Sequence, residues 1–261
     1  MKVSESSLVI GILILLILFF FIVLPPKGGS SPSIDTVHAI NLDKDKERWA
    51  SLTAAATISK VPLQRWPATY GKDIPYDDFR GLGVGHAMIR PDRNDKEHKK
   101  LVNLGVAGCF LSTRRLLTHL SILSYPSSAG HLILDDDVVL PPDLLHPSGR
   151  WSQVKHTIPK DWDMIYLGIW TATGEDVAPG VKKLRFRDDE KNVNLGTFAY
   201  IVRHGAISKI LPHLTYMIDA IDEQYTYKFN EWNVYALTPN LISINEEMNE
   251  DSSINKINVA T

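Results

Sequence analysis

Hydrophobic and polar positions along the chain follow a pattern that predicts strands and helices in turn. Short, nearly continuous apolar runs predict buried strands at 36–42, 63–70, 131–137, 164–168, 197–202 and 234–245, the last broken at Pro239. Apolar positions at helical spacing predict a helix at 109–123, acidic residues early and Lys60 at the end predict one at 43–60, and a third helix is predicted at 204–214. Strands that alternate with helices predict an α/β domain with a mostly parallel central sheet that is covered on both sides.

A longer apolar run at residues 8–24 carries no charge and predicts an N-terminal transmembrane helix, a signal anchor. A cleaved signal peptide is less favoured, because the run is long and no A-x-A pattern follows it. The predicted organisation is a short N-terminal tail (1–7), the anchor (8–24), a flexible stem (25–33), the domain (34–245) and a polar tail (246–261). A short tail before a single span predicts a single-pass type II membrane protein, whose domain lies in the Golgi or endoplasmic reticulum lumen if the chain is eukaryotic.

Composition and charge exclude several classes of function. The formal net charge is −2, so there is no basic field for nucleic acid. Cys109 is the only cysteine, which excludes an internal disulfide and a cysteine-rich zinc site. Residues 71–104 are polar and predict a long loop. The glycines at 81–85 lack the spacing of a dinucleotide fingerprint, and the chain contains no P-loop sequence.

The feature with the most chemical content is the acidic triplet Asp135-Asp136-Asp137, which lies between two aliphatic blocks. An ionised carboxylate in apolar surroundings is costly unless a partner such as a divalent cation compensates it. Alternate residues of a strand face the same side, so Asp135 and Asp137 are predicted to share one cation while Asp136 faces away. Such hard oxygen ligands suit Mg²⁺ or Mn²⁺, which also binds substrate phosphates. A solvated turn or a helix cap is the alternative interpretation of the triplet.

Asn41 to Asp43 follow the first predicted strand, as the triplet follows another. In open α/β sheets, ligands bind beyond the carboxyl ends of the strands, so both segments are predicted to share one crevice. A metal that holds phosphates there points to a nucleotide-activated substrate.

Eight segments, in this order along the chain, resemble glycosyltransferase family 25, which contains lipopolysaccharide sugar transferases and procollagen galactosyltransferases. They are Ile40–Asp43 with Glu47-Arg48, Arg65–Gly71, Gly108–Ser112, the LILDDDVVL stretch, Trp162–Gly168, Gly196–Val202, Ile218-Asp219 and Val234–Pro239.

The resemblance implies a GT-A type fold, a Rossmann-like single domain that binds a nucleotide sugar and a metal. It implies a transferase that moves a sugar such as galactose from a nucleotide-diphosphate sugar, expected to be a UDP-sugar, to a hydroxyl of a glycan, lipid-linked glycan or protein, with inversion. Asp135 and Asp137 would be the metal pair for Mn²⁺ or Mg²⁺. The residues that would contact the donor are Asn41, Arg48, Ser112 and Asp136. Inversion needs a base for the acceptor hydroxyl, and Asp219 is the candidate.

Each of these roles has a structural alternative. Arg48 could be an exposed helix residue, Ser112 a helix cap and Asp219 a surface carboxylate, with Asp222 and Glu223 as rival bases. Trp162, Trp170 and Trp232 are candidates for an acceptor groove or for the core.

The chain departs from the family in two places: Thr113 stands where a histidine is usual, and Asp135 where glutamate is preferred. A catalytically degenerate module that binds sugar nucleotides or glycans is therefore the alternative function. A metal-dependent phosphohydrolase is a third hypothesis, but no further acidic or histidine ligands are identified for it.

Overall fold

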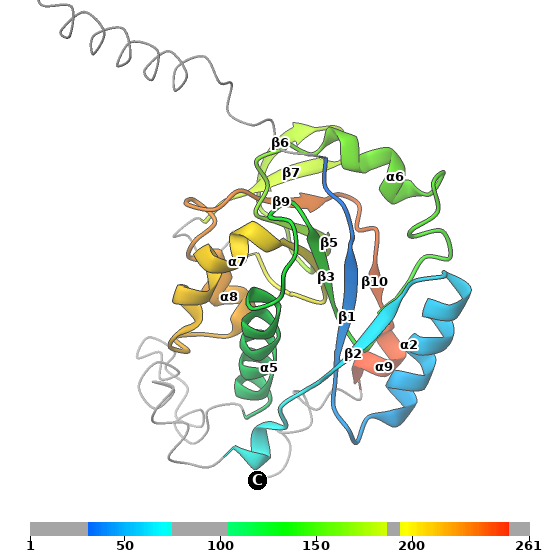
Figure 1. The fold of residues 1–261 in the computed structure, drawn as a ribbon, viewed down its shortest axis with the longest axis vertical. Helices are drawn as coiled ribbons and strands as arrows, with labels where there is room; N and C mark the ends of the chain where they lie inside the picture. Colours follow the sequence, from blue (N-terminus) through cyan, green and yellow to red (C-terminus); the bar gives the residue numbers. More distant parts are fainter. Residues whose placement is uncertain (1–30, 75–103, 187–193, 251–261) are drawn as a thin grey trace, which may run out of the picture. The chain divides into compact units, whose positions relative to one another are not determined.

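The computed structural model describes residues 31–74, 104–186 and 194–250, which belong to one compact unit. Their main feature is a sheet of eight strands in the order β2-β1-β3-β8-β5-β9-β7-β6 (Figure 1). The strands are β1 (Thr36–Asn41), β2 (Leu63–Pro67), β3 (Gly130–Asp135), β5 (Met164–Gly168), β6 (Gly174–Ala178), β7 (Val181–Leu184), β8 (Ala199–Arg203) and β9 (Val234–Leu237). A second, two-stranded sheet pairs β4 (Val138–Val139) with β10 (Ser243–Ile244).

Most strands of the large sheet point the same way. β1 pairs in parallel with both β2 and β3, and β5 pairs in parallel with β9. β8 is antiparallel to its neighbours β3 and β5, and β7 is antiparallel to β9 and β6. The prediction of a mostly parallel α/β sheet therefore agrees with the direction of most strands. β8 and β7 run in the opposite direction.

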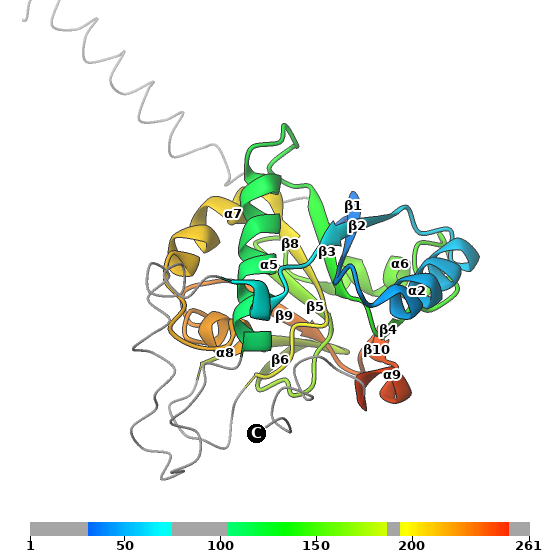
Figure 2. The ribbon, with the colours of Figure 1, turned by 90° about the horizontal axis from the view of Figure 1, so that it is seen from below.

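Helices cover both faces of the sheet (Figures 1 and 2). One layer contains α5 (Leu104–Ser121), α7 (His204–Ile210) and α8 (Ile221–Thr226), and the other contains α2 (Lys46–Ile58) and α6 (Arg150–Val154). Short helical turns are η1 (Gly71–Asp73), η3 (Lys155–Thr157) and η4 (Leu211–Leu214), and α9 (Glu246–Glu250) follows β10. Along β3, Ile133 packs into the core on the α5 side, whereas Leu132 and Leu134 pack on the α2 side. Burial on both faces explains the continuous apolar runs.

The predicted elements lie close to the observed ones, with a few differences. The strand predicted at 164–168 has the bounds of β5, and the helix predicted from Cys109 already includes Leu104. The tail predicted from Glu246 begins as α9. The β6–β7 hairpin is an element that the pattern does not predict, because polar residues dominate β6. Much of the predicted loop at 71–104, including the glycines at 81–85, lies outside the described residues.

The transmembrane helix in the predicted fold class requires a correction. Within the described ranges, no helix is long and apolar enough to cross a membrane, and the segment 8–24 lies outside these ranges. The longest described helix, α5, buries Phe110 and Leu117 against the sheet but carries Arg114 and Arg115 on its surface. The fold class is therefore corrected to the α/β domain alone, without support for an N-terminal membrane helix.

A buried histidine network ties β1 to β3 away from the acidic triplet. The Thr36 hydroxyl lies 2.8 Å from His131 Nδ1 and 2.9 Å from His38 Nε2. His131 Nε2 lies 3.1 Å from Nδ1 of His204. Burial, together with nearby histidines, lowers the pKa of both His38 and His131 to about 4. Both rings are therefore neutral in the folded protein at neutral pH.

We expect this network to make stability depend on pH. The folded pKa of His38 and of His131 is below the unfolded value of about 6.5, so protonation favours the unfolded chain. Their contribution to stability is complete above pH ~6.5 and is lost progressively as the pH falls towards ~4. At pH ~5 the loss should be on the order of 1–2 kcal/mol per histidine, measured by urea unfolding.

His131→Gln is the control variant, because carboxyl groups with raised pKa values change stability in the opposite direction. The variant should be less stable at pH ~7 and should show a flatter profile between pH ~7 and ~5 than the wild-type protein. Parallel profiles for the two proteins would contradict the assignment.

Candidate active site

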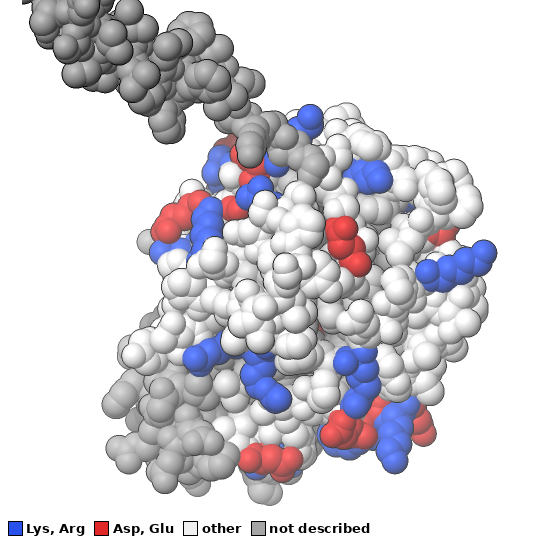
Figure 3. Space-filling view, in the orientation of Figure 1, with Lys and Arg blue, Asp and Glu red and all other residues white. Residues whose placement is uncertain are grey.

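A cavity of about 370 Å³ opens at the carboxyl ends of β1 and β3. Asp135 to Asp137 line it, as do Arg48 of α2 and Ser112 of α5. Because β8 is antiparallel, the residues just before its first residue, Thr197 and Phe198, contribute to the same edge. The crevice predicted from the strand ends is therefore present. On the face shown in Figure 3, side chains of both signs are interspersed, in keeping with the small net charge.

The acidic triplet forms the end of β3 and the turn that follows it. The strand ends at Asp135, and Asp136 and Asp137 occupy the turn before β4. The alternation of a strand stops there, so the prediction that Asp136 faces away from the site is wrong. The pairing of β4 with β10 holds the turn, and the Asn245 amide donates to the Asp137 carbonyl at 2.7 Å.

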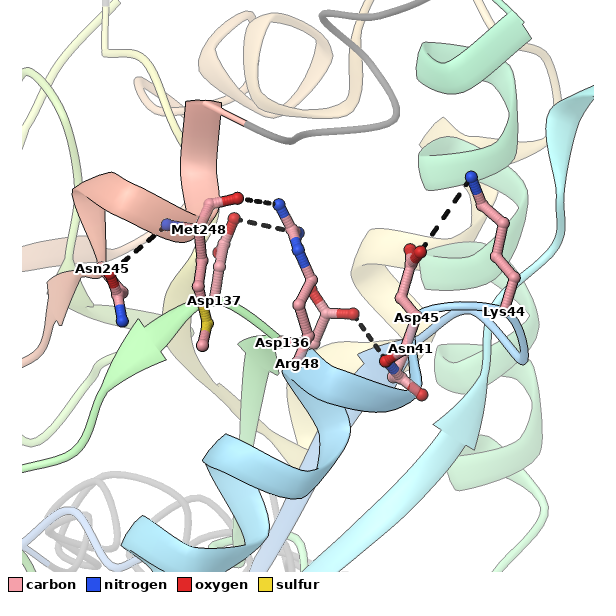
Figure 4. Close-up of polar contacts among 8 residues, drawn as sticks. All are labelled: Asn41, Lys44, Asp45, Arg48, Asp136, Asp137, Asn245 and Met248. Carbon is pink, nitrogen blue, oxygen red and sulfur yellow. Dashed lines mark hydrogen bonds and ion pairs between the residues drawn. The ribbon is translucent and has the colours of Figure 1, made fainter.

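Arg48 reaches from α2 between the last two aspartates (Figure 4). Its Nη1 donates to Asp136 Oδ1 at 2.9 Å and to Asp137 Oδ2 at 3.2 Å, and its Nη2 donates to the Met248 carbonyl. Burial alone would lower the pKa of Arg48, but the two carboxylates outweigh it and raise that pKa. Arg48 is therefore a partly buried cation of the acidic site rather than an exposed helix residue.

Asn41 connects this cluster to β2. Its Nδ2 donates to Asp136 Oδ2 at 2.6 Å and to the Asp45 carbonyl at 3.1 Å, as Figure 4 shows in part. Its Oδ1 accepts from Arg65 Nε at 2.7 Å, and Arg65 also pairs with Asp43 at 2.6 Å. Both oxygens of Asp136 are thus engaged by protein donors. Asn41 and Asp136 position the site, and Arg65 is a supporting residue that the sequence interpretation did not single out.

Ser112 lies in the cavity wall but in the middle of α5, so it does not cap a helix start. Its hydroxyl donates to the Gly108 carbonyl at 2.6 Å and accepts from the Thr69 amide at 2.7 Å. A Cβ on Gly108 would lie 2.6 Å from the Thr69 carbonyl oxygen, so only glycine allows this close approach. Ser112 therefore holds the segment after β2 against α5. Thr113 is buried on the same helix, but it is absent from the cavity lining.

The carboxylates of Asp135 and Asp137 both lie in the cavity wall. Asp137 Oδ1 is buried without a hydrogen-bond partner among the described residues, whereas the backbone amide of Asp135 donates to the Phe198 carbonyl at 2.9 Å. Burial and the charges of Asp137 and Asp136 raise the pKa of Asp135 well above its ordinary value. Burial also raises the pKa of Asp137, which Arg48 partly offsets. These two side chains fit a divalent cation, which would relieve both the desolvation and the repulsion.

Such a cation would take most of its ligands from elsewhere. Among the described residues, no group of three or more histidine, cysteine, aspartate or glutamate side chains is arranged to hold a metal. Two protein carboxylates, completed by water and phosphate oxygens, are typical of Mg²⁺ and Mn²⁺ sites that bind a substrate diphosphate. Cys109 also lines the cavity, and burial raises the pKa of its thiol, which makes it a poor nucleophile.

The candidate bases lie around the start of α8. Asp219 accepts from the Tyr227 hydroxyl at 2.7 Å and from the Ala220 amide at 3.0 Å, and it is absent from the cavity lining. Asp222 lines the cavity, and its Oδ2 accepts from the Gly196 amide at 2.9 Å. The structure therefore brings Asp222 to the acidic site and leaves Asp219 in contact with Tyr227.

Comparison with known proteins gives similarities in sequence but no match to a family model. The chain is 26% identical over 185 residues to procollagen galactosyltransferase 1-A of Xenopus laevis, covering 69% of this chain and 28% of that protein. It is 26% identical over 137 residues to a glycosyltransferase 25 family member of Drosophila pseudoobscura pseudoobscura, covering 52% of this chain and 21% of that protein. The chain thus spans less than a third of the length of these relatives. The resemblance to glycosyltransferase family 25 is confirmed.

A solved structure also aligns with the chain. It is a glycosyltransferase involved in the glycosylation of the major capsid of PBCV-1, with a TM-score of 0.34 and 11% identity. The alignment covers 70% of this chain and 66% of that one. At that TM-score the likeness carries no argument about the fold or the GT-A assignment.

Proposed function

We propose that this chain, which is similar to proteins of glycosyltransferase family 25, is a metal-dependent glycosyltransferase. It would transfer a sugar, with galactose as the first candidate, from a nucleotide-diphosphate sugar to a hydroxyl of a glycan, lipid-linked glycan or protein. The observation that carries the proposal is the pair of carboxylates Asp135 and Asp137 in a cavity that also contains Arg48, with Asp137 Oδ1 buried and without a partner among the described residues. A diphosphate and a divalent cation together would satisfy these charges.

Asp135 and Asp137 would hold Mn²⁺ or Mg²⁺, the ion that would stabilise negative charge on the departing nucleotide diphosphate. Arg48, on α2, would stabilise the same negative charge of the diphosphate. Its contacts with Asp136, Asp137 and Met248 engage Nη1 and one N–H of Nη2. Among the described residues, none accepts from the Nε–H or the second Nη2–H, which would bind phosphate oxygens in the fork geometry typical of guanidinium groups.

Asp222 rather than Asp219 is our candidate for the base, because it lines the cavity. The acceptor hydroxyl oxygen would form a bond to the anomeric carbon of the donor, on the face opposite the leaving group. The bond from that carbon to the diphosphate oxygen breaks, and its electron pair leaves with the diphosphate. Asp222 would take the hydroxyl proton, and the anomeric configuration would invert because the attack is on the face opposite the leaving group. The Gly196 amide holds Asp222 Oδ2 in place for this role.

A donor screen tests the proposal. The purified chain, supplied with Mn²⁺ and a panel of nucleotide sugars that includes UDP-galactose, should release nucleotide diphosphate from one donor in the presence of hydroxyl acceptors. EDTA should stop the release and added Mn²⁺ should restore it. A folded chain that binds a donor with Mn²⁺ but never releases diphosphate would instead identify the degenerate binding module. A chain that binds no donor at all would contradict both hypotheses.

A further inference from the structure

Trp170, which follows β5, is a large aromatic side chain that the fold leaves exposed at the cavity. Its relative exposure is 55%, and it is part of the cavity lining. Most large aromatic residues of the domain are buried instead, including Trp162 and Trp232, which settles those two as core residues. An exposed tryptophan at the wall of a cavity that also contains charged side chains has an apolar face that a ligand can cover.

The position of Trp170 is fixed by its neighbours. Its ring contacts Phe198 edge-on, with 5.6 Å between the ring centroids, and its backbone amide donates to the Leu195 carbonyl at 2.9 Å. Gly196 has a φ of +91°, and a Cβ there would lie 2.2 Å from Trp170 Cδ1. Only a glycine allows the indole to lie against the backbone at this point. The ring is therefore held in place before any ligand arrives.

Gly196 also connects the indole to a carboxylate. Its amide donates to Asp222 Oδ2 at 2.9 Å, so one residue contacts both Trp170 and Asp222. A pyranose ring matches this pair of groups. Its carbon-bound hydrogens carry partial positive charge and pack on the negative face of an indole, and its hydroxyl groups donate to a carboxylate. A uracil ring also has a flat face, but it offers a carboxylate one ring N–H donor at N3, whereas a pyranose offers several hydroxyl donors.

We propose that Trp170 is a stacking platform for a pyranose ring, with Asp222 accepting from a hydroxyl of that ring. The inference rests on the proposed function and extends it by naming a residue that selects the sugar. The ring could come from the acceptor or from the donor, and Asp222 as base favours the acceptor. Arg48 lies in the first turn of α2 and Asp135 ends β3, whereas Trp170 follows β5, so the platform and the groups assigned to the diphosphate come from different elements of the same cavity wall.

Two binding measurements on the wild-type chain and on Trp170→Ala and Trp170→Phe test the platform. Calorimetry with Mn²⁺ compares UDP with UDP-galactose, which reports on a donor ring. Saturation-transfer NMR with the methyl β-glycosides of galactose and glucose reports on an acceptor ring. Tyr216→Ala is the matched control, because Tyr216 is also exposed but does not line the cavity.

We expect Trp170→Ala to weaken the binding of a pyranose ligand by about five- to tenfold, with a smaller loss for Trp170→Phe. UDP affinity should be unchanged, and Tyr216→Ala should match the wild type. A loss of UDP affinity in Trp170→Ala would assign the ring to the nucleobase and overturn the platform. Unchanged affinity for every ligand, or no pyranose binding by the wild type in either measurement, would also overturn it. Failure of the proposed function is a different result: no binding of UDP or UDP-galactose by the wild-type chain.

Discussion

Replacing Asp137 by alanine should reduce sugar transfer by at least about 10³-fold, because the site loses one of the two carboxylates that would hold the metal. Asp137 Oδ1 is buried and has no hydrogen-bond partner among the described residues, so the side-chain contact that the variant loses there is the one from Arg48 Nη1 to Asp137 Oδ2 at 3.2 Å. Asp136 still pairs with Arg48 at 2.9 Å in the variant. The melting temperature should therefore stay close to that of the wild-type protein while transfer is lost.

Two variants make this result interpretable. Asp137→Asn keeps the shape of the side chain and should lose activity as well, which excludes a packing effect. Asp143→Ala removes an exposed aspartate that does not line the cavity, and it should keep full activity. Transfer at the wild-type rate by Asp137→Ala would rule out Asp137 as a metal ligand. If Asp137→Ala does not fold, the activity of Asp137→Asn alone decides whether Asp137 is a metal ligand.

The second large effect is expected at Asp222. Asp222 Oδ2 accepts from the Gly196 amide and Oδ1 from the Glu223 amide, and Asp222→Asn keeps one acceptor oxygen for these amides. The amide side chain cannot take a proton, so kcat should fall by about 10²–10⁴-fold. Donor affinity should change little, because the binding groups for the diphosphate lie on β1, β3 and α2. The measurement is kcat together with the affinity for the nucleotide sugar under Mn²⁺.

Asp219→Asn is the matched control for that experiment. It is an equal change three residues earlier, at a carboxylate that accepts from Tyr227 and lies outside the cavity lining. Its kcat should remain within about threefold of the wild-type value. The reverse outcome, a large loss in Asp219→Asn and a small one in Asp222→Asn, would return the base to Asp219, as the family resemblance implies.

The buried strands were predictable from the chain itself. β5 is buried along its whole length between two helical layers, so its apolar run has sharp ends and the predicted bounds match. The β6–β7 hairpin was not predictable in this way. Its polar residues lie at the edge of the sheet, where Asp176 and Lys182 pair with each other in solvent and leave no apolar period to detect.

The site was predictable at its centre and less so around it. Because both segments follow strands, the sequence predicted that Asn41 and the acidic triplet share one crevice. In the structure, Asn41 Nδ2 lies 2.6 Å from Asp136 Oδ2. The orientation of the Asp136 side chain was not predictable from the sequence, because the alternation of a strand does not show where the strand ends. β3 ends at Asp135, so Asp136 lies outside the alternation. Whether Asp219 or Asp222 is the better candidate for the base depends on where α8 begins, which is at Ile221. Helix boundaries predicted from sequence are uncertain by a residue or two, so the sequence does not decide between these two aspartates.

Binding of Mn²⁺ by Asp135 and Asp137 is tested most directly by electron paramagnetic resonance, in which free Mn²⁺ gives a six-line signal that binding removes. Titration of Mn²⁺ into the purified chain with UDP present should remove the free signal stoichiometrically, and Asp137→Asn should restore it. Asp143→Ala should behave as the wild type. If the free signal is undiminished in the wild-type chain with UDP, the two carboxylates are not a metal site for a nucleotide diphosphate.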